Sequence, residues 1–405
     1  MTAKRGLSAM TLLFALGGCG ADRDSRPPTV VERDSLGIAI VENSLTRLDA
    51  TCTVGADPAV TIGTAIGEDA YHLYRVFGAT VMADGRMALV NQGTEELRMY
   101  APDGTFLFAA GREGDGPGEF RNAFHLFRTA GDTLWVGDYW PWEFEVFGPT
   151  GEWVRGVRPS PTQPDRPPEG GILSDGRAVL GFDDRTRRSA AFTVASLHVL
   201  LYAANGGVLD TLHVGSFGRW GQLDGPSSTW IYPWFEARTE LAARGDRYVL
   251  GHGSAPELQV YRLDADPRLE RIVRWTGVDQ SVGPSDVAAA RAELEARYVD
   301  AGGSPAAELA LSDDRPVAEI MPVMRDVQLG ADGTIWIQEF PRPTDATQNR
   351  WIRFDGTGRL TCRLALPPGL EVYEFGSDYV LGLGEGEFRA EQVMLYRLVL
   401  PASGD

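Results

Sequence analysis

The residues with the clearest chemical character are aromatic side chains gathered around prolines. Tyr139, Trp140 and Trp142 occur in the segment DYWPWE, and Tyr232 and Trp234 occur in TWIYPWF. Aromatic rings that gather at a surface can stack on sugars, peptides or apolar ligands. Aromatic side chains also fill the space between packed sheets, so the sequence leaves a stacking surface and a core role open.

Arginines form a second set of candidate binding residues. Arg187 lies in the segment DDRTRRS, Arg342 lies in PRPTDATQNR, and Arg325 lies in an apolar run. Guanidinium groups bind carboxylates and phosphates with paired N–H donors, so arginines on one face predict an anionic ligand. The alternative is a set of solvated loops in which these arginines pair with neighbouring acids.

Recognisable catalytic motifs are absent from the sequence. The histidines have no metal-binding spacing, and there is no HExxH, CxxC or Gly-x-Ser-x-Gly segment. Lys4 is the only lysine, which excludes lysine-nucleophile chemistry once a leader is removed. We therefore predict no catalytic residues and no cofactor, and a divalent metal held by acids and amides in a channel stays an open alternative. His125 and Arg325 are candidates to face such a channel.

A repeated pattern of short strands must position these side chains. Alternating apolar runs end at turn pairs such as Asp84-Gly85 and Asp103-Gly104, the strongest short-range signal of a β-hairpin. Similar turns at Gly131-Asp132, Asp175-Gly176 and Gly245-Asp246, and two more at Asp332-Gly333 and Ser377-Asp378, give six units. Units of about four strands in about 40 residues predict an all-β, six-bladed β-propeller.

Two further elements complete this prediction. The last unit shows three strands, so we expect residues 35–43, an isolated β-run, to pair with it and close the ring. Between the fourth and fifth blades, residues 281–316 predict a small helical insertion, because Val287, Ala290, Leu294 and Tyr298 recur at helical spacing. The helices are expected on a rim of the propeller or over the mouth of its channel.

The segment GREGDGPGEF, residues 111–120, resembles the Gly-rich turn that joins blades in NHL-type six-bladed propellers. The motif match covers about ten residues, although the turn spacing agrees over most of the chain. The resemblance implies a fold and not an activity, since such propellers include lactonase-like hydrolases, lyases and scaffolds.

The N-terminus is typical of an exported lipoprotein. Lys4 and Arg5 precede a short apolar run that ends in ALGGC, which resembles the bacterial lipobox with Cys19 as the lipidated residue. We therefore predict a signal peptide over residues 1–18, a flexible tether over 19–34 and the propeller over 35–401. Gly20 in place of an acid after the cysteine favours the periplasmic side of an outer membrane, and a simple secretory signal is the alternative.

The net charge limits the kinds of partner that the protein can bind, and the cysteines bear on its redox compartment. The formal net charge is −18, and loss of Lys4 and Arg5 leaves −20, which argues against nucleic-acid binding and against a polybasic membrane patch. Attachment to a membrane would then depend on the lipid at Cys19. Cys52 and Cys362 remain in an oxidising compartment, where they either form a disulfide or stay as two buried thiols.

Taken with the missing catalytic motifs, these features predict a lipid-anchored, extracytoplasmic binding or interaction module for a peptide, glycan or protein partner. A metal-assisted, lactonase-like propeller enzyme is the alternative. Whether the chain is an enzyme stays open, with the non-catalytic interpretation favoured.

Overall fold

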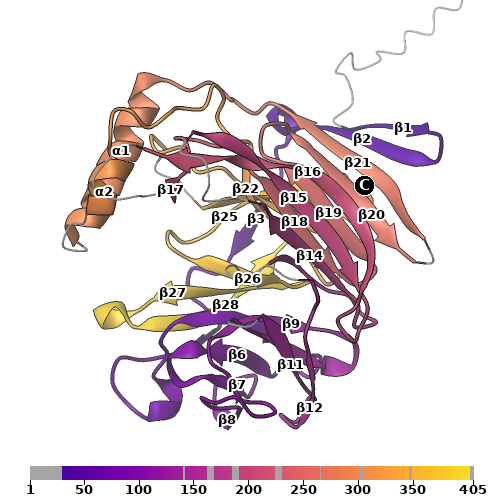
Figure 1. Ribbon diagram of the computed structural model, residues 1–405, viewed down its shortest axis with the longest axis vertical. Helices are drawn as coiled ribbons and strands as arrows, with labels where there is room; N and C mark the ends of the chain where they lie inside the picture. The colour runs from indigo at the N-terminus through magenta and orange to yellow at the C-terminus, as the bar shows by residue number, and fades with distance from the viewer. Residues whose placement is uncertain are drawn as a thin grey trace, which may run out of the picture.

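The computed structural model describes residues 30–139, 142–161, 168–184, 191–223, 230–264, 266–300, 305–345 and 349–401. These residues form five hydrogen-bonded sheets and two α-helices (Figure 1). The predicted all-β class is confirmed.

The first three sheets follow the order of the chain. The first sheet holds β5 (Val76–Val81), β6 (Met87–Asn91), β7 (Glu96–Tyr100) and β8 (Phe106–Ala110). The second holds β9 (Ala123–Arg128), β10 (Leu134–Asp138), β11 (Glu143–Phe147) and β12 (Trp153–Val157). The third holds β13 (Glu169–Ile172), β14 (Ala178–Asp183), β15 (Thr193–Tyr202), β16 (Val208–Gln222) and β17 (Trp230–Ile231).

The other two sheets also take strands from the N-terminal part of the chain. The fourth sheet holds β18 (Thr239–Arg244), β19 (Arg247–His252), β20 (Glu257–Leu263), β21 (Pro267–Thr276), β2 (Ile38–Ser44) and β1 (Val30–Ser35). The fifth holds β22 (Met324–Leu329), β23 (Ile335–Glu339), β24 (Arg350–Phe354), β25 (Leu360–Ala365), β3 (Thr51–Val54), β28 (Glu391–Val399), β27 (Tyr379–Glu385), β26 (Glu371–Phe375) and β4 (Val60–Ile62).

Six strands lie around one central cavity. They are β5, β9, β13, β18, β22 and β26, and each of them lies beside two others of this set. Sheets that radiate from a common cavity form the β-propeller arrangement. The faces between neighbouring sheets are filled by apolar clusters, for example Trp336 stacked on Phe375 with ring centroids 4.1 Å apart.

The predicted turn pairs form the hairpins. Gly85, Gly104, Gly176 and Gly333 all adopt positive φ between 78° and 88°, a conformation that costs glycine little and that tight strand connections require. The local signal in the sequence therefore placed these turns between the strands that they join.

The expected partner of the N-terminal strand is wrong. Residues 35–43 overlap β2, which pairs in parallel with β21 of the fourth sheet and not with the last unit. The strands that pair with β28 are β4, along Val60–Ile62, and β3. In the chain, these two short strands come after β2 and shortly before β5. They pair with the open edge of β28, whereas β2 covers the edge of β21.

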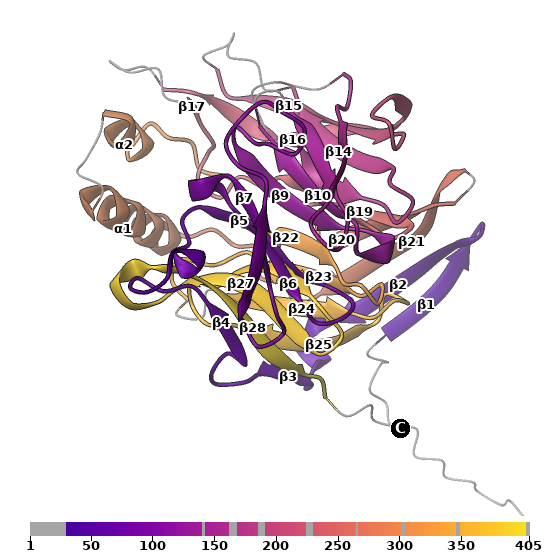
Figure 2. The ribbon, with the colours of Figure 1, turned by 90° about the horizontal axis from the view of Figure 1, so that it is seen from below.

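The folded part also begins earlier than expected. Residues 30–34, predicted to belong to the tether, are part of β1, which forms a hairpin with β2 (Figure 2). The predicted signal peptide and Cys19 lie outside the described residues.

Two helices lie in the predicted insertion. Helix α1 (Pro284–Asp300) and helix α2 (Pro305–Ala310) stand at one side of the molecule, away from the β1–β2 hairpin (Figures 1 and 2). Ala290 of α1 packs against Trp234, Phe235 and Met321. Within the described residues, neither helix has both the length and the apolar character needed to cross a membrane.

Candidate functional site

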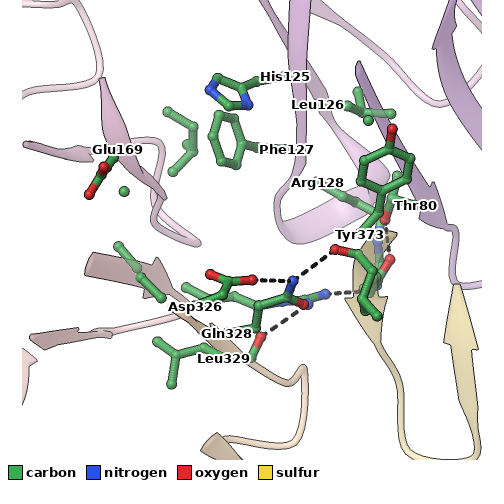
Figure 3. Close-up of a pocket in the computed structure, with 18 of the residues that line it drawn as sticks. Thr80, His125, Leu126, Phe127, Arg128, Glu169, Asp326, Gln328, Leu329 and Tyr373 are labelled. Carbon is green, nitrogen blue, oxygen red and sulfur yellow. Dashed lines mark hydrogen bonds and ion pairs between the residues drawn. The ribbon is translucent and has the colours of Figure 1, made fainter. Parts of the chain in front are cut away.

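The central cavity has a volume of about 560 Å³ and is lined by all six of the strands that surround it. Figure 3 shows side chains from several of these strands around the cavity, among them His125, Glu169, Asp326 and Tyr373. We call this cavity the channel, and we call the end where the six strands begin its mouth.

β-Bulges interrupt four of the six strands near the mouth. The register against the next strand shifts at residues 77–78 of β5, at His125 of β9, at Arg325 of β22 and at Tyr373 of β26. A bulge inserts an extra residue and changes the direction of its side chain, and bulges are frequent beside binding sites. His125 adopts φ +60°, which is strained for a residue other than glycine.

Carboxylates gather at one side of the mouth. They come from four consecutive strands of the ring and are Glu169 (β13), Glu240 (β18), Asp326 (β22) and Glu371 (β26). Two arginines lie near them. Arg238 Nη2 is 3.7 Å from Glu240 Oε1, and Arg325 interacts electrostatically with Glu240, Asp326 and Glu371.

Burial and repulsion between carboxylates keep the carboxyl groups of Glu240, Asp326 and Glu371 from ionising easily. Burial raises the pKa of Asp326 to about 6, against the donors Gln328 Nε2, at 3.1 Å, and the backbone N–H of Val327. Burial, followed by repulsion from Glu169 and Asp326, also raises the pKa of Glu240 well above its ordinary value. Burial raises the pKa of Glu371, and Arg325 opposes that shift. A positive charge placed among these groups would relieve both effects.

The opposite side of the channel is aromatic. Phe77 and Phe124 have ring centroids 4.3 Å apart, and His125 packs edge-on against Phe124 at 4.5 Å. Burial lowers the pKa of His125 to about 4, so its imidazole is neutral at physiological pH. Figure 3 shows the ring of Phe127 below that of His125. This side offers stacking surface and a neutral hydrogen-bonding group.

The end of the channel opposite the mouth is closed by polar contacts centred on Glu374. Arg244 Nη2 donates to Glu374 Oε1 at 2.7 Å, and Thr80 Oγ1 donates to Glu374 Oε2 at 2.6 Å. Arg128 Nη2 lies 3.8 Å from Glu374 Oε1. These contacts connect β5, β9, β18 and β26 across the end of the channel opposite the mouth.

A second cavity, of about 770 Å³, adjoins the mouth. We call it the vestibule. It shares Asp326, Glu371 and Val372 with the channel. Helix α1 forms one wall, and aromatic residues form much of the rest, among them Trp234, Phe235, Phe340 and Trp351.

Two of the predicted ligand-binding residues line the vestibule. Arg325 is exposed there, and it forms no hydrogen bond or ion pair within 4 Å in the described part of the chain. Trp234 also lines it, although its side chain is mostly buried and Arg315 lies over its ring at 3.8 Å. The structure brings Trp234, from the segment between β17 and β18, and Arg325 of β22 to one cavity.

Four other predicted residues have different surroundings. Trp142 is buried and packs against Phe144, which favours the core role that the sequence left open for these aromatics. Tyr139 packs against the same cluster, and Tyr232 lies beside Trp220 with ring centroids 6.2 Å apart. Arg342 binds Asp286 of α1 at 3.2 Å, which favours the alternative in which these arginines pair with neighbouring acids.

Trp140 and Arg187, the remaining predicted ligand residues, lie outside the described residues. The predicted metal alternative lacks a visible donor set, since the residues that the structure describes contain no group of three or more His, Cys, Asp or Glu side chains arranged to hold a metal.

The two cysteines in the described part of the chain meet. Cys52 of β3 and Cys362 of β25 form a disulfide with Cα atoms 5.5 Å apart, and both residues are buried. At the disulfide, β3 and β25 pair as parallel strands, with Leu364 opposite Cys52. The bond thus connects the N-terminal part of the chain to the fifth sheet across 310 residues.

Sequence reasoning missed the carboxylates of the mouth. Glu169, Glu240 and Glu371 lie at or near the starts of strands that are far apart in the chain, without a shared motif. A usable signal was their common position shortly before an alternating apolar run. Aligning the six units on their turns would have placed these acids at one end of the ring.

Comparison with known proteins leaves the family open. No family model matches the chain, and no curated protein is significantly similar to it. Solved structures with a similar fold include a Bacteroides fragilis NCTC 9343 protein inferred to be exported, with 11% identity, 89% of this chain and 99% of that chain covered, and a TM-score of 0.49.

Two further similar structures have names that differ in function. The calcium-binding protein regucalcin from Agrobacterium tumefaciens str. C58 has 12% identity, covers 87% of this chain and 96% of its own, and has a TM-score of 0.40. A virginiamycin B lyase from Staphylococcus aureus has 9% identity, with 92% and 99% covered and a TM-score of 0.37. Such low similarity transfers no activity, so function has to be argued from the channel and the vestibule.

Proposed function

We propose that this chain is a six-bladed β-propeller that binds a small organic ligand, or a small protruding part of a larger one, in its channel. The ligand enters through the vestibule. The carrying observation is the shape and lining of these two adjoining cavities, one closed at its far end by the Glu374 contacts and one open beside α1.

Six blades are supported by the six strands that line the channel. The nine-stranded sheet divides into one blade of β22–β25 and another of β26–β28 with β4, joined by β3, which pairs with both β25 and β28. In this proposal β4 supplies the outer strand of the last blade and closes the ring.

The proposed location is extracytoplasmic, with the protein attached to a membrane through a lipid on Cys19. The apolar run followed by ALGGC supports lipidation, and the buried Cys52–Cys362 disulfide fits an oxidising compartment. The outer membrane is favoured by Gly20. The resemblance of residues 111–120 to the NHL-type turn belongs to the same proposal, since Gly111 and Gly118 there take positive φ.

The proposed ligand is smaller than some of the partners expected for the interaction module that the sequence predicts. An exposed aromatic face would suit a large protein partner, but Trp142 is buried and Trp234 is largely covered by its neighbours. The space that remains is concave and lies around the mouth, which suits a small ligand, a sugar unit or a single peptide side chain.

A ligand-observed NMR screen of several chemical classes against the purified full-length chain tests the proposal. Hits should compete with one another and should be lost in Gln328→Trp, because an indole at this position would occupy the channel. Leu107→Trp, at an exposed position of β8, is the matched control and should bind normally. Hits that survive Gln328→Trp, or no hits at all, would contradict channel binding.

A second candidate function is proton-transfer catalysis on the bound ligand. It is favoured by Asp326, a channel carboxyl whose pKa of about 6 suits exchange of a proton near neutral pH. If the protein is an enzyme, Asp326→Asn should lose turnover with a substrate found by the screen, even at substrate concentrations that saturate the variant. Equal turnover by the variant would remove this candidate.

A further inference from the structure

The asymmetric lining of the channel suggests the chemical class of its ligand, an inference that rests on the proposed ligand-binding function. The strands β13, β22 and β26 bring carboxyl groups to the lining of the channel, and Glu240 of β18 interacts electrostatically with two of them, whereas β5 and β9 bring aromatic rings. We propose that the ligand is an organic cation, in which an ammonium group lies among Glu240, Asp326 and Glu371 and an apolar or aromatic body lies against Phe77, Phe124 and Phe127.

The charge balance at the mouth supports this assignment. Among the described residues, the carboxyl groups of Glu240, Asp326 and Glu371 interact electrostatically with the guanidinium groups of Arg238 and Arg325. The contact of Arg238 with Glu240 is long, at 3.7 Å, and Arg325 is exposed in the vestibule. Glu240, Asp326 and Glu371 can therefore accept a further positive charge, and an ammonium group can donate hydrogen bonds to several of their oxygens at once.

His125 gives an independent indication of a ligand. Its ring lines the channel, it makes ring contacts with Phe124, Phe127 and Trp142, and it has no hydrogen-bond partner in the described ranges. A bulge with φ +60° directs this residue, and Figure 3 shows its ring beside the cavity. A neutral imidazole held in a strained conformation without a protein partner is a group prepared to bond a polar atom of the ligand body.

An organic cation suits this lining better than a metal ion. Hard divalent cations need several oxygen ligands directed at one point, and the described acids do not form such a group. Aromatic faces, by contrast, attract ammonium groups and stack on apolar rings. The channel volume of about 560 Å³ has room for a ligand larger than a hydrated ion.

Isothermal titration calorimetry with three matched probes tests the inference. The probes are benzylamine, benzyl alcohol and benzoate, which share a ring and differ in the charge of the attached group, and Ca²⁺ is titrated separately. The full-length chain should bind benzylamine at least tenfold more tightly than benzyl alcohol, and benzoate should bind more weakly still. The preference should fall at least tenfold in Asp326→Asn combined with Glu240→Gln.

The variants are chosen so that loss of binding has one cause. Both substitutions keep the shape of the side chain and remove a charge that is costly to bury, so the fold should not be weakened. Glu385→Gln, an exposed residue that pairs with Arg389, makes the control for a change of net charge and should keep the preference.

The outcomes separate the two proposals. Equal affinity for benzylamine and benzyl alcohol, both lost in Gln328→Trp, would overturn the cationic ligand and leave ligand binding in the channel intact. Ca²⁺ binding that displaces benzylamine would replace the organic cation by a metal. No binding of any probe, together with an empty NMR screen, would contradict both proposals.

Discussion

Arg244 Nη2 and Glu374 Oε1 lie 2.7 Å apart at the far end of the channel, although 130 residues separate them in the chain. The pair connects β18 to β26 across the cavity. Glu374 is buried, and it also accepts hydrogen bonds from Thr80 and from the backbone of Val81. One carboxylate thus closes the pocket and holds several blades together.

Replacing this carboxylate should weaken the fold. Glu374→Gln removes the charge that faces Arg244 and Arg128, and we expect a loss of about 2 kcal/mol in the free energy of unfolding. Urea unfolding measures the change. In a double-mutant cycle, Glu374→Gln with Arg244→Met should cost less than the sum of the single losses. Additive losses would mean that the pair does not couple the two strands.

The disulfide should stabilise the protein. Because it connects residues 310 positions apart, its reduction should lower the free energy of unfolding by about 2–5 kcal/mol. Urea unfolding with and without reductant measures this difference. The double variant Cys52→Ala, Cys362→Ala should be less stable and insensitive to reductant. If reductant leaves the free energy of unfolding of the wild-type chain unchanged, this result would argue against the disulfide.

Asp326 predicts a pH dependence of stability. Its pKa is about 6 in the folded chain against 3.8 as the ordinary value, so at pH 5 the folded state binds more protons than the unfolded state. Stability therefore falls as pH rises from about 4 to about 6, and the loss is complete above that range.

The variant Asp326→Asn isolates this contribution. It should be more stable than the wild type at pH 7, by on the order of 2 kcal/mol, and the difference should shrink towards pH 4. Thermal unfolding in a pH series measures it. Glu169, Glu240 and Glu371 face the same region, and the raised pKa values of Glu240 and Glu371 add to the wild-type slope with the same sign. A constant difference at all pH values would contradict the shift.

Arg342 should hold helix α1 over the vestibule. Its guanidinium binds Asp286, which is buried, and the carbonyl oxygens of Asp279 and Ser281. In Arg342→Ala we expect faster hydrogen exchange over residues 284–300 and little change in the sheets, measured by mass spectrometry. Arg389→Ala, which removes an exposed arginine, is the control. Unchanged exchange in α1 would show that Arg342 is dispensable for the helix.

Trp234 should contribute to stability as well as to the wall of the vestibule. It is 7% exposed and packs against Phe235 and Ala290, so Trp234→Ala should cost about 3–5 kcal/mol. A test of ligand binding at this position therefore needs Trp234→Phe, which keeps an aromatic ring. Phe388→Ala, at a residue 81% exposed, should change stability by less than about 0.5 kcal/mol.

The sequence by itself determined the hairpins and the class of the fold. Asp-Gly pairs need positive φ, and alternating apolar residues bury one face of a strand, so turns such as Asp84-Gly85 could be placed without knowledge of the rest of the chain. The helix of residues 284–300 followed from its own spacing of apolar residues. These signals are local, because they depend on neighbours within a few positions.

Only the tertiary structure decided which distant segments meet. Residues 38–44 pair with β21, while residues 60–62 pair with β28, and each choice depends on which sheet edge is left open and within reach. The bulges that direct His125 and Arg325, and the carboxylates Glu240 and Asp326 that gather at the mouth, depend on the closeness of strands in the ring. Burial then shifts the pKa values of His125, Glu240 and Asp326, since desolvation arises from the surrounding fold and not from residue type.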